Sequence, residues 1–163
     1  MTTQQNLALL AAALLLASCG GSSPAPAQKQ ATASVPAPKP VDESRRLPKE
    51  NQVGTEVVER QLMGKGFMPG GTSGRYRKGK QEYELFLAQM PTANDAAIAL
   101  LDWKRAMKDA KMIPAFGAYY GTDRDRPVFV FTKGRWVAGV AGLSERQADP
   151  PARVLASRLS FED

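Results

Sequence analysis

The sequence predicts an α+β domain: an antiparallel sheet of about four or five strands with about three packed helices, after a disordered N-terminal tether. Three observations support this fold class. Apolar residues recur at helical spacing in several segments. Between these segments, short runs of aromatic and β-branched residues are joined by brief Gly-containing turns, as in antiparallel hairpins. The first 48 of the 163 residues differ in composition, with a Leu/Ala run followed by an Ala/Pro-rich stretch.

Residues 1–18 are predicted to form a signal peptide. Leu7 to Ala17 contains only Leu and Ala. This run is too short to span a bilayer, which needs about 20 apolar residues, but it is long enough for the apolar region of an export signal. Met1 to Asn6 departs from the usual pattern because it contains no Lys or Arg. That departure puts the start of the chain in question more than the signal itself.

The segment Leu16-Ala17-Ser18-Cys19 resembles the lipobox of bacterial lipoproteins. The resemblance implies cleavage between Ser18 and Cys19, and lipidation of the Cys19 thiol. Two or three acyl chains make a durable anchor, whereas one binds a membrane only marginally. The alternative interpretation is an ordinary secretory signal followed by a chance cysteine. Gly20 stands where an Asp would favour the inner membrane, so the resemblance implies the outer membrane, facing the periplasm.

Residues 19–48 are predicted to be the lipidated cysteine and a linker. This stretch contains half of the 12 prolines and no aromatic residue. It therefore cannot bury enough apolar surface to offset the entropic cost of ordering. Its Ala-Pro repeats favour extended polyproline II at about 3.1 Å per residue. We expect a spacer that holds residues 49–163, the globular domain, away from the membrane.

The first half of the domain is predicted to begin with a helix. Val53, Val57, Val58 and Leu62 recur at helical spacing, which predicts a helix over about 53–63 that ends before Gly64 and Gly66. The glycine-rich residues 70–74 are predicted to form a loop. Strands are expected over 75–78 and 83–90, on either side of a turn at Gly79-Lys80.

The second half alternates helix, strands and helix. Thr92 and Asp95 resemble a capping box, and the helix that follows presents one apolar face, made of Ala93, Ala96, Ala97, Leu100, Trp103, Met107 and Ala110. Strands are expected over 115–120, 128–132 and 135–141, the last two joined by a Lys133-Gly134 turn. Asp149 followed by Pro150 predicts the start of a final helix, with Val154, Leu155 and Leu159 as its buried stripe.

Two counts exclude whole classes of chemistry. The chain has no histidine, so neither a Cys/His zinc site nor a Ser-His-Asp triad can form within it. It has one cysteine, Cys19, so it forms no intramolecular disulfide. The net charge of +6 would favour anionic partners. For an exported protein these are anionic envelope components, and nucleic acid is not expected. No cofactor motif is present.

Three groups of charged residues are candidates for a site. Arg75, Arg77, Lys78 and Lys80 form a basic run that suits contact with a ligand or partner, although a solvated edge strand explains the same pattern. Asp123 and Asp125 match only part of a calcium loop, and pairing with nearby arginines accounts for them. Glu82 and Glu84 share one face of a strand, as paired catalytic carboxylates would, but they also fit an exposed strand.

The segment from about Val57 to Leu159 is similar to domains of unknown function in secreted bacterial proteins. The similar features are the Gly66-Phe67 helix end, the Tyr76 and Tyr83 strands, the Ala-rich helix and residues 131–137. This resemblance implies no catalytic residue. We therefore expect a lipid-anchored envelope protein with a non-enzymatic binding or interaction domain. The alternatives are a tethered envelope enzyme that uses carboxylates, and a subunit of an envelope assembly.

Overall fold

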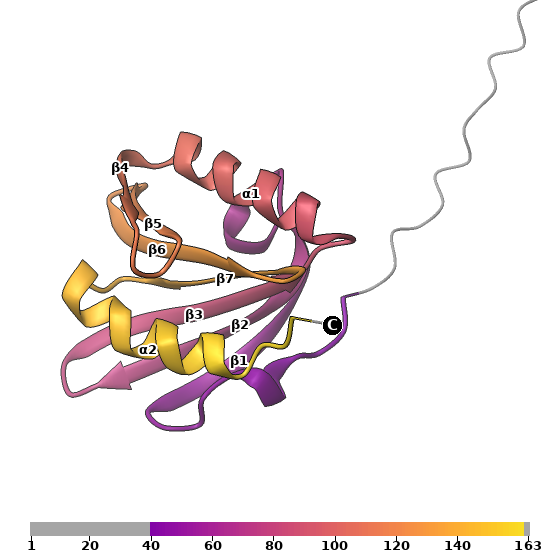
Figure 1. Ribbon diagram of the computed structural model, residues 1–163. Coiled ribbons are helices and arrows are strands. Elements are labelled where there is room, and N and C mark those ends of the chain that lie inside the picture. The colour runs from indigo at the N-terminus through magenta and orange to yellow at the C-terminus, as the bar shows by residue number, and fades with distance from the viewer. Residues whose placement is uncertain (1–39, 162–163) are drawn as a thin grey trace, which may run out of the picture. The chain divides into compact units, whose positions relative to one another are not determined.

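The structure, a computed structural model, describes residues 40–161. The predicted signal peptide, Cys19 and the tether up to residue 39 lie outside the described residues. Residues 40–161 form one seven-stranded sheet in the order β1-β2-β3-β7-β6-β5-β4, with all neighbouring strands antiparallel. Two α-helices, α1 and α2, lie on opposite sides of this sheet (Figure 1).

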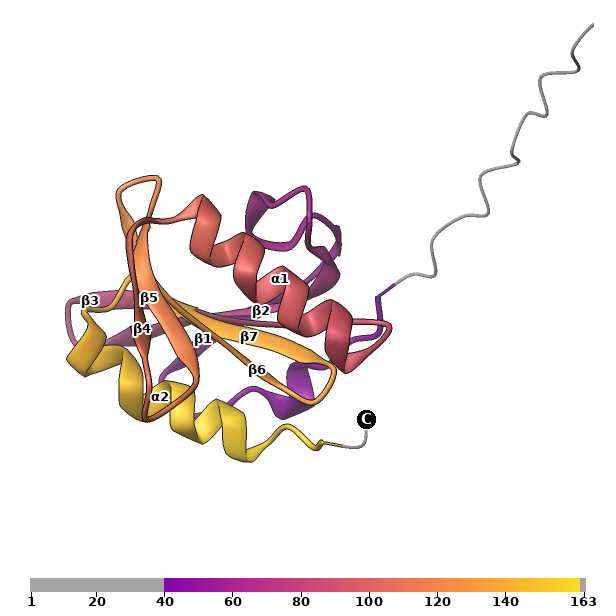
Figure 2. The ribbon, with the colours of Figure 1, turned by 45° about the horizontal axis from the view of Figure 1, so that its top comes forward.

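The elements follow the chain in a simple order. Three strands are followed by α1, four further strands and α2, with two short 3-10 turns near the start. The bounds are η1 Ser44–Arg46, β1 Gln52–Arg60, η2 Leu62–Gly64, β2 Pro69–Lys78, β3 Gln81–Gln89, α1 Ala93–Ala106, β4 Lys108–Ile113, β5 Ala118–Asp123, β6 Arg126–Lys133, β7 Trp136–Ala141 and α2 Glu145–Ser157. The sheet is strongly twisted, so that β4 and β5 cross the direction of β1–β3 (Figure 2).

Each face of the sheet has its own hydrophobic core. On β3, Leu85 and Leu87 belong to the cluster on the α2 side, and Phe86 and Ala88 belong to the cluster on the α1 side, because successive strand residues point to opposite faces. Both clusters consist only of residues between Leu47 and Leu159. The described residues therefore form a hydrophobic core on each face of the sheet.

The predicted number of elements is wrong: the sheet has seven strands, and there are two α-helices where three were expected. The helix predicted over 53–63 is strand β1. Val53 and Val57 are exposed, at 56% and 39%, so their helical spacing does not mark a buried stripe. β-branched residues favour an extended chain, and β1 is an edge strand that is open to solvent along one side.

The glycine-rich residues 70–74 form the first half of β2, and not a loop. These glycines are needed because neighbours approach the strand closely. A Cβ atom on Gly71 would collide with the carbonyl oxygen of Leu87 and lie 2.9 Å from Cδ2 of Leu62. On the α2 side, a Cβ on Gly74 would lie 2.9 Å from Cδ1 of Leu47. Glycine therefore permits tight packing here and does not mark the loop that the sequence predicts.

Helix α1 begins where the sequence predicted but ends sooner. The Thr92 side chain accepts a hydrogen bond from the backbone amide of Asp95. Trp103 is fully buried, whereas Ala93 and Ala97 of the predicted stripe are exposed. The chain leaves the helix after Ala106, and the unpredicted edge strand β4 follows. Its charged sequence and the register shift between Lys108 and Lys111 hide the strand pattern and also protect the sheet edge from further pairing.

Helix α2 starts earlier than predicted. Ser144 is the N-cap and forms a capping box with Gln147, so Asp149 lies inside the helix and Pro150 and Pro151 fall in its second turn. Leu155 and Leu159 are buried as expected, but Val154 is exposed at 44%.

The predicted hairpins are present with small shifts. Strands β2 and β3 meet at the Gly79-Lys80 turn, as predicted. Strands β6 and β7 pair through Lys133 and Trp136, so their turn residues are Gly134 and Arg135 and not Lys133 and Gly134. The strand predicted over 115–120 is β5, which begins at Ala118 and runs to Asp123. Within residues 40–161, neither helix is long and apolar enough to cross a bilayer.

Candidate functional site: a groove between α2 and the β2–β3 hairpin

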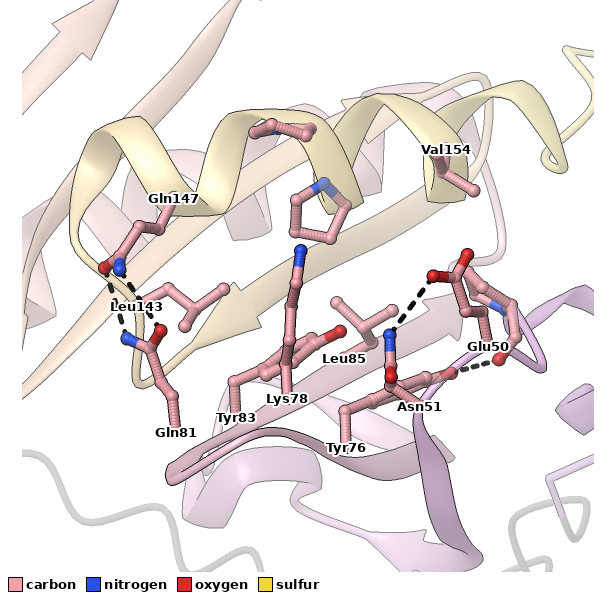
Figure 3. A pocket seen from close by; sticks show the side chains of 13 residues that line it. Glu50, Asn51, Tyr76, Lys78, Gln81, Tyr83, Leu85, Leu143, Gln147 and Val154 are labelled. Atoms are coloured by element: carbon pink, nitrogen blue, oxygen red, sulfur yellow. Dashed lines mark hydrogen bonds between the residues drawn. The ribbon is translucent and has the colours of Figure 1, made fainter.

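A groove of about 400 Å³ lies between α2 and the N-terminal strands. Its volume falls within the range of pockets for small ligands, roughly 300–1,000 Å³. Strands β2 and β3 form its floor, α2 forms one wall, and the turn before β1 closes one end (Figure 3). The lining residues are Pro48, Glu50, Asn51, Tyr76, Lys78, Gln81, Tyr83, Leu85, Leu143, Gln147, Pro150, Pro151 and Val154.

Two stacked tyrosines form the floor of the groove. Tyr76 and Tyr83 are directly opposed across the hairpin, and their ring centroids lie 5.1 Å apart with an interplanar angle of 19°. The Tyr76 hydroxyl donates to the carbonyl oxygen of Pro48 at 2.8 Å and accepts from Gln52 at 3.2 Å. Tyr76 is buried and Tyr83 is half-buried, so Tyr83 presents the accessible aromatic surface.

Both tyrosines are held in the neutral, proton-donating form. Burial raises the pKa of Tyr76 to about 12, against the smaller opposing effect of the Gln52 hydrogen bond. Burial also raises the pKa of Tyr83, and the negative charge of Glu50 adds to that effect. A phenol in this state at neutral pH donates a hydrogen bond and does not act as a base.

Polar side chains stand at both ends of the groove and across its middle. At one end, the amides of Gln81 and Gln147 bond to each other twice, at 3.2 and 3.1 Å, which joins the β2–β3 turn to α2. At the other end, Asn51 donates to Glu50 at 3.4 Å. Lys78 extends from the floor toward α2 (Figure 3). Each end therefore offers amide groups, and the middle offers a cation.

The helical wall combines apolar rings with backbone acceptors. Pro150 and Pro151 line the groove, and neither has an amide hydrogen. The carbonyl oxygens of Arg146 and Gln147, four residues earlier, therefore lack their usual helical donors. The wall thus presents two pyrrolidine rings to whatever occupies the groove.

The predicted basic run is divided between the two faces of the sheet. Lys78 lies in the groove, whereas Arg75 and Arg77 line a shallower hollow of about 240 Å³ on the α1 side of the sheet. Lys80 sits in the hairpin turn. The run therefore does not form a single patch.

The hollow on the α1 side contains the predicted carboxylate pair. Glu82 and Glu84 are on the same face, as expected, but each is bound by an arginine. Arg77 bonds Glu82 at 2.6 Å, and Arg126 bonds Glu84 at 2.8 Å. Arg75 faces Glu84 in the strand register and has no carboxylate within ion-pair distance among residues 40–161. The arginines neutralise both carboxylates, which works against a role in acid–base catalysis.

The two residues of the partial calcium motif, Asp123 and Asp125, lie at a tight hairpin turn between β5 and β6. Arg124 and Asp125, its central residues, both have positive φ, at 46° and 64°, as a type I′ turn requires. Asp123 binds the buried Lys65 at 2.6 Å. In the described part of the chain, no group of three or more acidic or cysteine side chains is placed to hold a metal ion. The partial calcium motif is thus accounted for by a turn and an ion pair.

The groove itself was not predicted from the sequence. A usable signal was present: a two-residue turn at Gly79-Lys80 places Tyr76 opposite Tyr83 on one face of the hairpin. The helical wall had no such signal, because Pro150 indicated a helix start and not a position in the second turn. The lipidation and cleavage positions, Cys19 and Ser18, lie outside the described residues.

Neither the sequence nor the structure matches a protein-family model, a curated protein or a solved structure. Roles for individual residues therefore rest on the geometry given above.

Proposed function

We propose that the chain is a lipid-anchored protein of the cell envelope, held in the outer membrane through Cys19 and facing the periplasm, and that its domain binds a partner or ligand in the groove. The groove is the observation that carries the binding role. It combines an aromatic floor, apolar walls and amide groups at both ends. This mixture of broad apolar contact and a few polar anchors is typical of binding sites.

The arrangement favours binding over catalysis. The groove contains one carboxylate, Glu50, paired with an amide, and no second acid beside it. The carboxylates on the opposite face are neutralised by Arg77 and Arg126. The role of an assembly subunit is supported less well, because the exposed large apolar residues are distributed over both helices and both edge strands, whereas a stable interface needs a contiguous patch.

The anchor and the groove support one another. The predicted lipidation at Cys19 would place the domain at a membrane surface, with the intervening residues as the spacer. A binding groove on such a domain is consistent with a role in retaining an envelope component.

A pull-down from solubilised membranes tests both the lipid anchor and binding in the groove. The full chain is compared with Cys19→Ala, Val154→Glu and Leu101→Glu. Val154 lies in the groove wall and Leu101 on α1, and both are 44% exposed, so the last two variants are matched in burial and charge. We expect Cys19→Ala to be lost from the membrane fraction. We expect Val154→Glu to lose the captured partner and Leu101→Glu to retain it.

Either half of the proposal can fail separately. A membrane-bound Cys19→Ala, together with a lipid-free mass for the wild type, would disprove the anchor. Equal capture by Val154→Glu and Leu101→Glu would show that the groove is not the binding surface.

A further inference from the structure

The floor and the helical wall of the groove offer side chains to a ligand and few backbone groups. The floor consists of β2 and β3, and the backbone N–H and C=O groups of a strand lie in the plane of its sheet and not toward the groove above it. In the wall, Pro150 and Pro151 have no amide hydrogen. A polypeptide that docks by strand addition needs main-chain partners. The groove is therefore better suited to a ligand that is recognised by side chains.

The Gln81 amide at one end of the groove can still bind hydroxyl groups. Its Oε1 accepts one hydrogen bond from Gln147 at 3.1 Å, and its Nε2 donates one to Gln147 at 3.2 Å. A side-chain amide has two donors and two acceptor sites, so Gln81 keeps one of each. The Gln147 oxygen is already used, because the backbone amide and the hydroxyl of Ser144 also donate to it. A free donor beside a free acceptor on Gln81 matches two neighbouring hydroxyl groups.

Tyr83 provides a flat apolar surface and a further donor. It is half-buried, and Tyr76 covers one face of its ring at a centroid distance of 5.1 Å, so the exposed part of the ring lies on the other side. The Tyr83 hydroxyl has no hydrogen-bond partner among residues 40–161, and burial keeps it protonated by raising its pKa. A pyranose ring has the complementary form, because its C–H groups make an apolar face and its hydroxyls surround the rim.

Lys78 adds a positive charge in the middle of the groove. Its side chain extends from the floor toward α2 (Figure 3), and no carboxylate among residues 40–161 lies within ion-pair distance of it. The one carboxylate that lines the groove in the described part of the chain, Glu50, lies at the other end beside Asn51. An anionic group above the floor would therefore meet an unpaired ammonium at short range.

We propose that the groove binds an acidic saccharide: a pyranose ring lies on Tyr83, neighbouring hydroxyls bond Gln81, and a carboxylate substituent pairs with Lys78. The inference rests on the proposed function, since it names the ligand class of the same groove. A uronic acid residue carries all three features on one ring. The stacked ring and the ion pair contribute separately, so loss of the charge weakens binding without abolishing it.

Calorimetric titration of the full chain in detergent tests this ligand class. The probes are trimers of glucuronic, galacturonic and mannuronic acid, each beside its methyl ester, which keeps the ring and lacks the charge. We expect at least one acid trimer to bind, and its ester to bind about three- to fivefold more weakly, as for a partly exposed ion pair. This difference should shrink at high salt, because screening weakens only the contribution of the charge.

Three variants locate the contacts. Lys78→Met should bind the acid and the ester equally. Lys80→Met removes the same charge from an exposed lysine in the same hairpin that does not line the groove, and should keep the wild-type preference for the acid. Tyr83→Leu should weaken both forms about tenfold, because an aromatic contact is lost. If Tyr83→Leu does not fold, as measured by circular dichroism, the comparison of the two lysine variants still decides the outcome.

Three results would overturn the inference. The first is that no acid trimer binds at millimolar concentration, and the second is that Lys78→Met keeps the wild-type preference for the acid. The third is equally tight binding of triglutamate, which carries carboxylates without sugar rings and would assign the groove to acidic peptides. Each failure is distinguishable from failure of the proposed function, because the membrane pull-down still shows whether capture of a partner depends on Val154.

Discussion

Replacing Lys65 with methionine is expected to lower the free energy of unfolding by about 3 kcal/mol. Lys65 follows η2, and its ammonium bonds the Asp123 carboxylate on β5 at 2.6 Å. The two side chains are only 10% and 14% exposed. The ammonium also lies 5.2 Å from the ring centroid of Trp103. The pair thus joins the β1–β2 connection to the far half of the sheet across the α1 side.

The magnitude follows from the separation and the burial. Two unit charges 2.6 Å apart attract by about 6 kcal/mol at an effective dielectric constant near 20. Desolvation of both groups opposes that attraction, so removing one partner of a buried pair costs about 3–5 kcal/mol, mainly because the other charge is left buried. Because both side chains keep some contact with solvent, we expect a loss at the lower end of this range. Methionine retains most of the apolar stem of lysine, so the loss of stability in Lys65→Met results mainly from removal of the charge.

Urea denaturation at neutral pH, followed by circular dichroism, measures the change. Lys65→Met should lose about 3 kcal/mol, whereas the double variant Lys65→Met/Asp123→Leu should lie within about 1 kcal/mol of the wild type because no charge remains buried. Arg105→Met is the control. It removes an exposed ion pair with Asp102 at 2.8 Å, in which Arg105 is 73% exposed, and should cost about 0.5 kcal/mol or less. Equal losses for Lys65→Met and Arg105→Met would refute the reasoning.

Three further predictions concern the floor of the groove, the sheet and the anchor. The folded pKa of Tyr76, about 12, exceeds its unfolded value near 10, so this group should contribute a fall in stability of about 3 kcal/mol between pH 10 and pH 12. Denaturation of the wild type beside Tyr76→Phe measures it: the variant should lack this contribution and keep only the smaller loss from other groups, such as Tyr83, whose pKa is also raised. Gly71→Ala should lower the free energy of unfolding by at least about 2 kcal/mol, because the new Cβ atom collides with the neighbouring strand. A Cβ atom on Gly66 has no neighbouring atom within 4 Å, so Gly66→Ala should unfold near the wild-type urea midpoint. Intact mass of the membrane-extracted protein should show a chain that begins at Cys19 and carries acyl groups, and an unmodified mass would contradict lipidation.

Local signals in the sequence located several elements correctly, but they did not reveal how residues are buried. Turn chemistry placed the β2–β3 hairpin, and the Thr92 cap placed the start of α1. Periodicity failed for β1, where Val53 and Val57 are exposed on an edge strand and fit a helical spacing by chance. It also failed for β4, whose charged residues show no alternation of apolar and polar side chains.

The site was harder to predict than the fold because it depends on long-range placement. Hairpin register alone could have paired Tyr76 with Tyr83. No local pattern indicates that α2 crosses above them, or that the segment ending at Pro48 closes one end. Glycine has different structural roles in neighbouring segments: Gly79 forms a turn, whereas Gly71 and Gly74 permit close packing within a strand.

Site-specific photo-crosslinking in intact envelopes tests most directly whether the groove of the anchored domain binds a ligand or partner. A photoreactive phenylalanine derivative replaces Val154 in the groove wall in one chain, and Leu101 on α1 in another, both with native Cys19. We expect an adduct to a partner from position 154 in the membrane fraction, and none from position 101. Equal adducts from both positions, or none from position 154, would contradict binding in the groove.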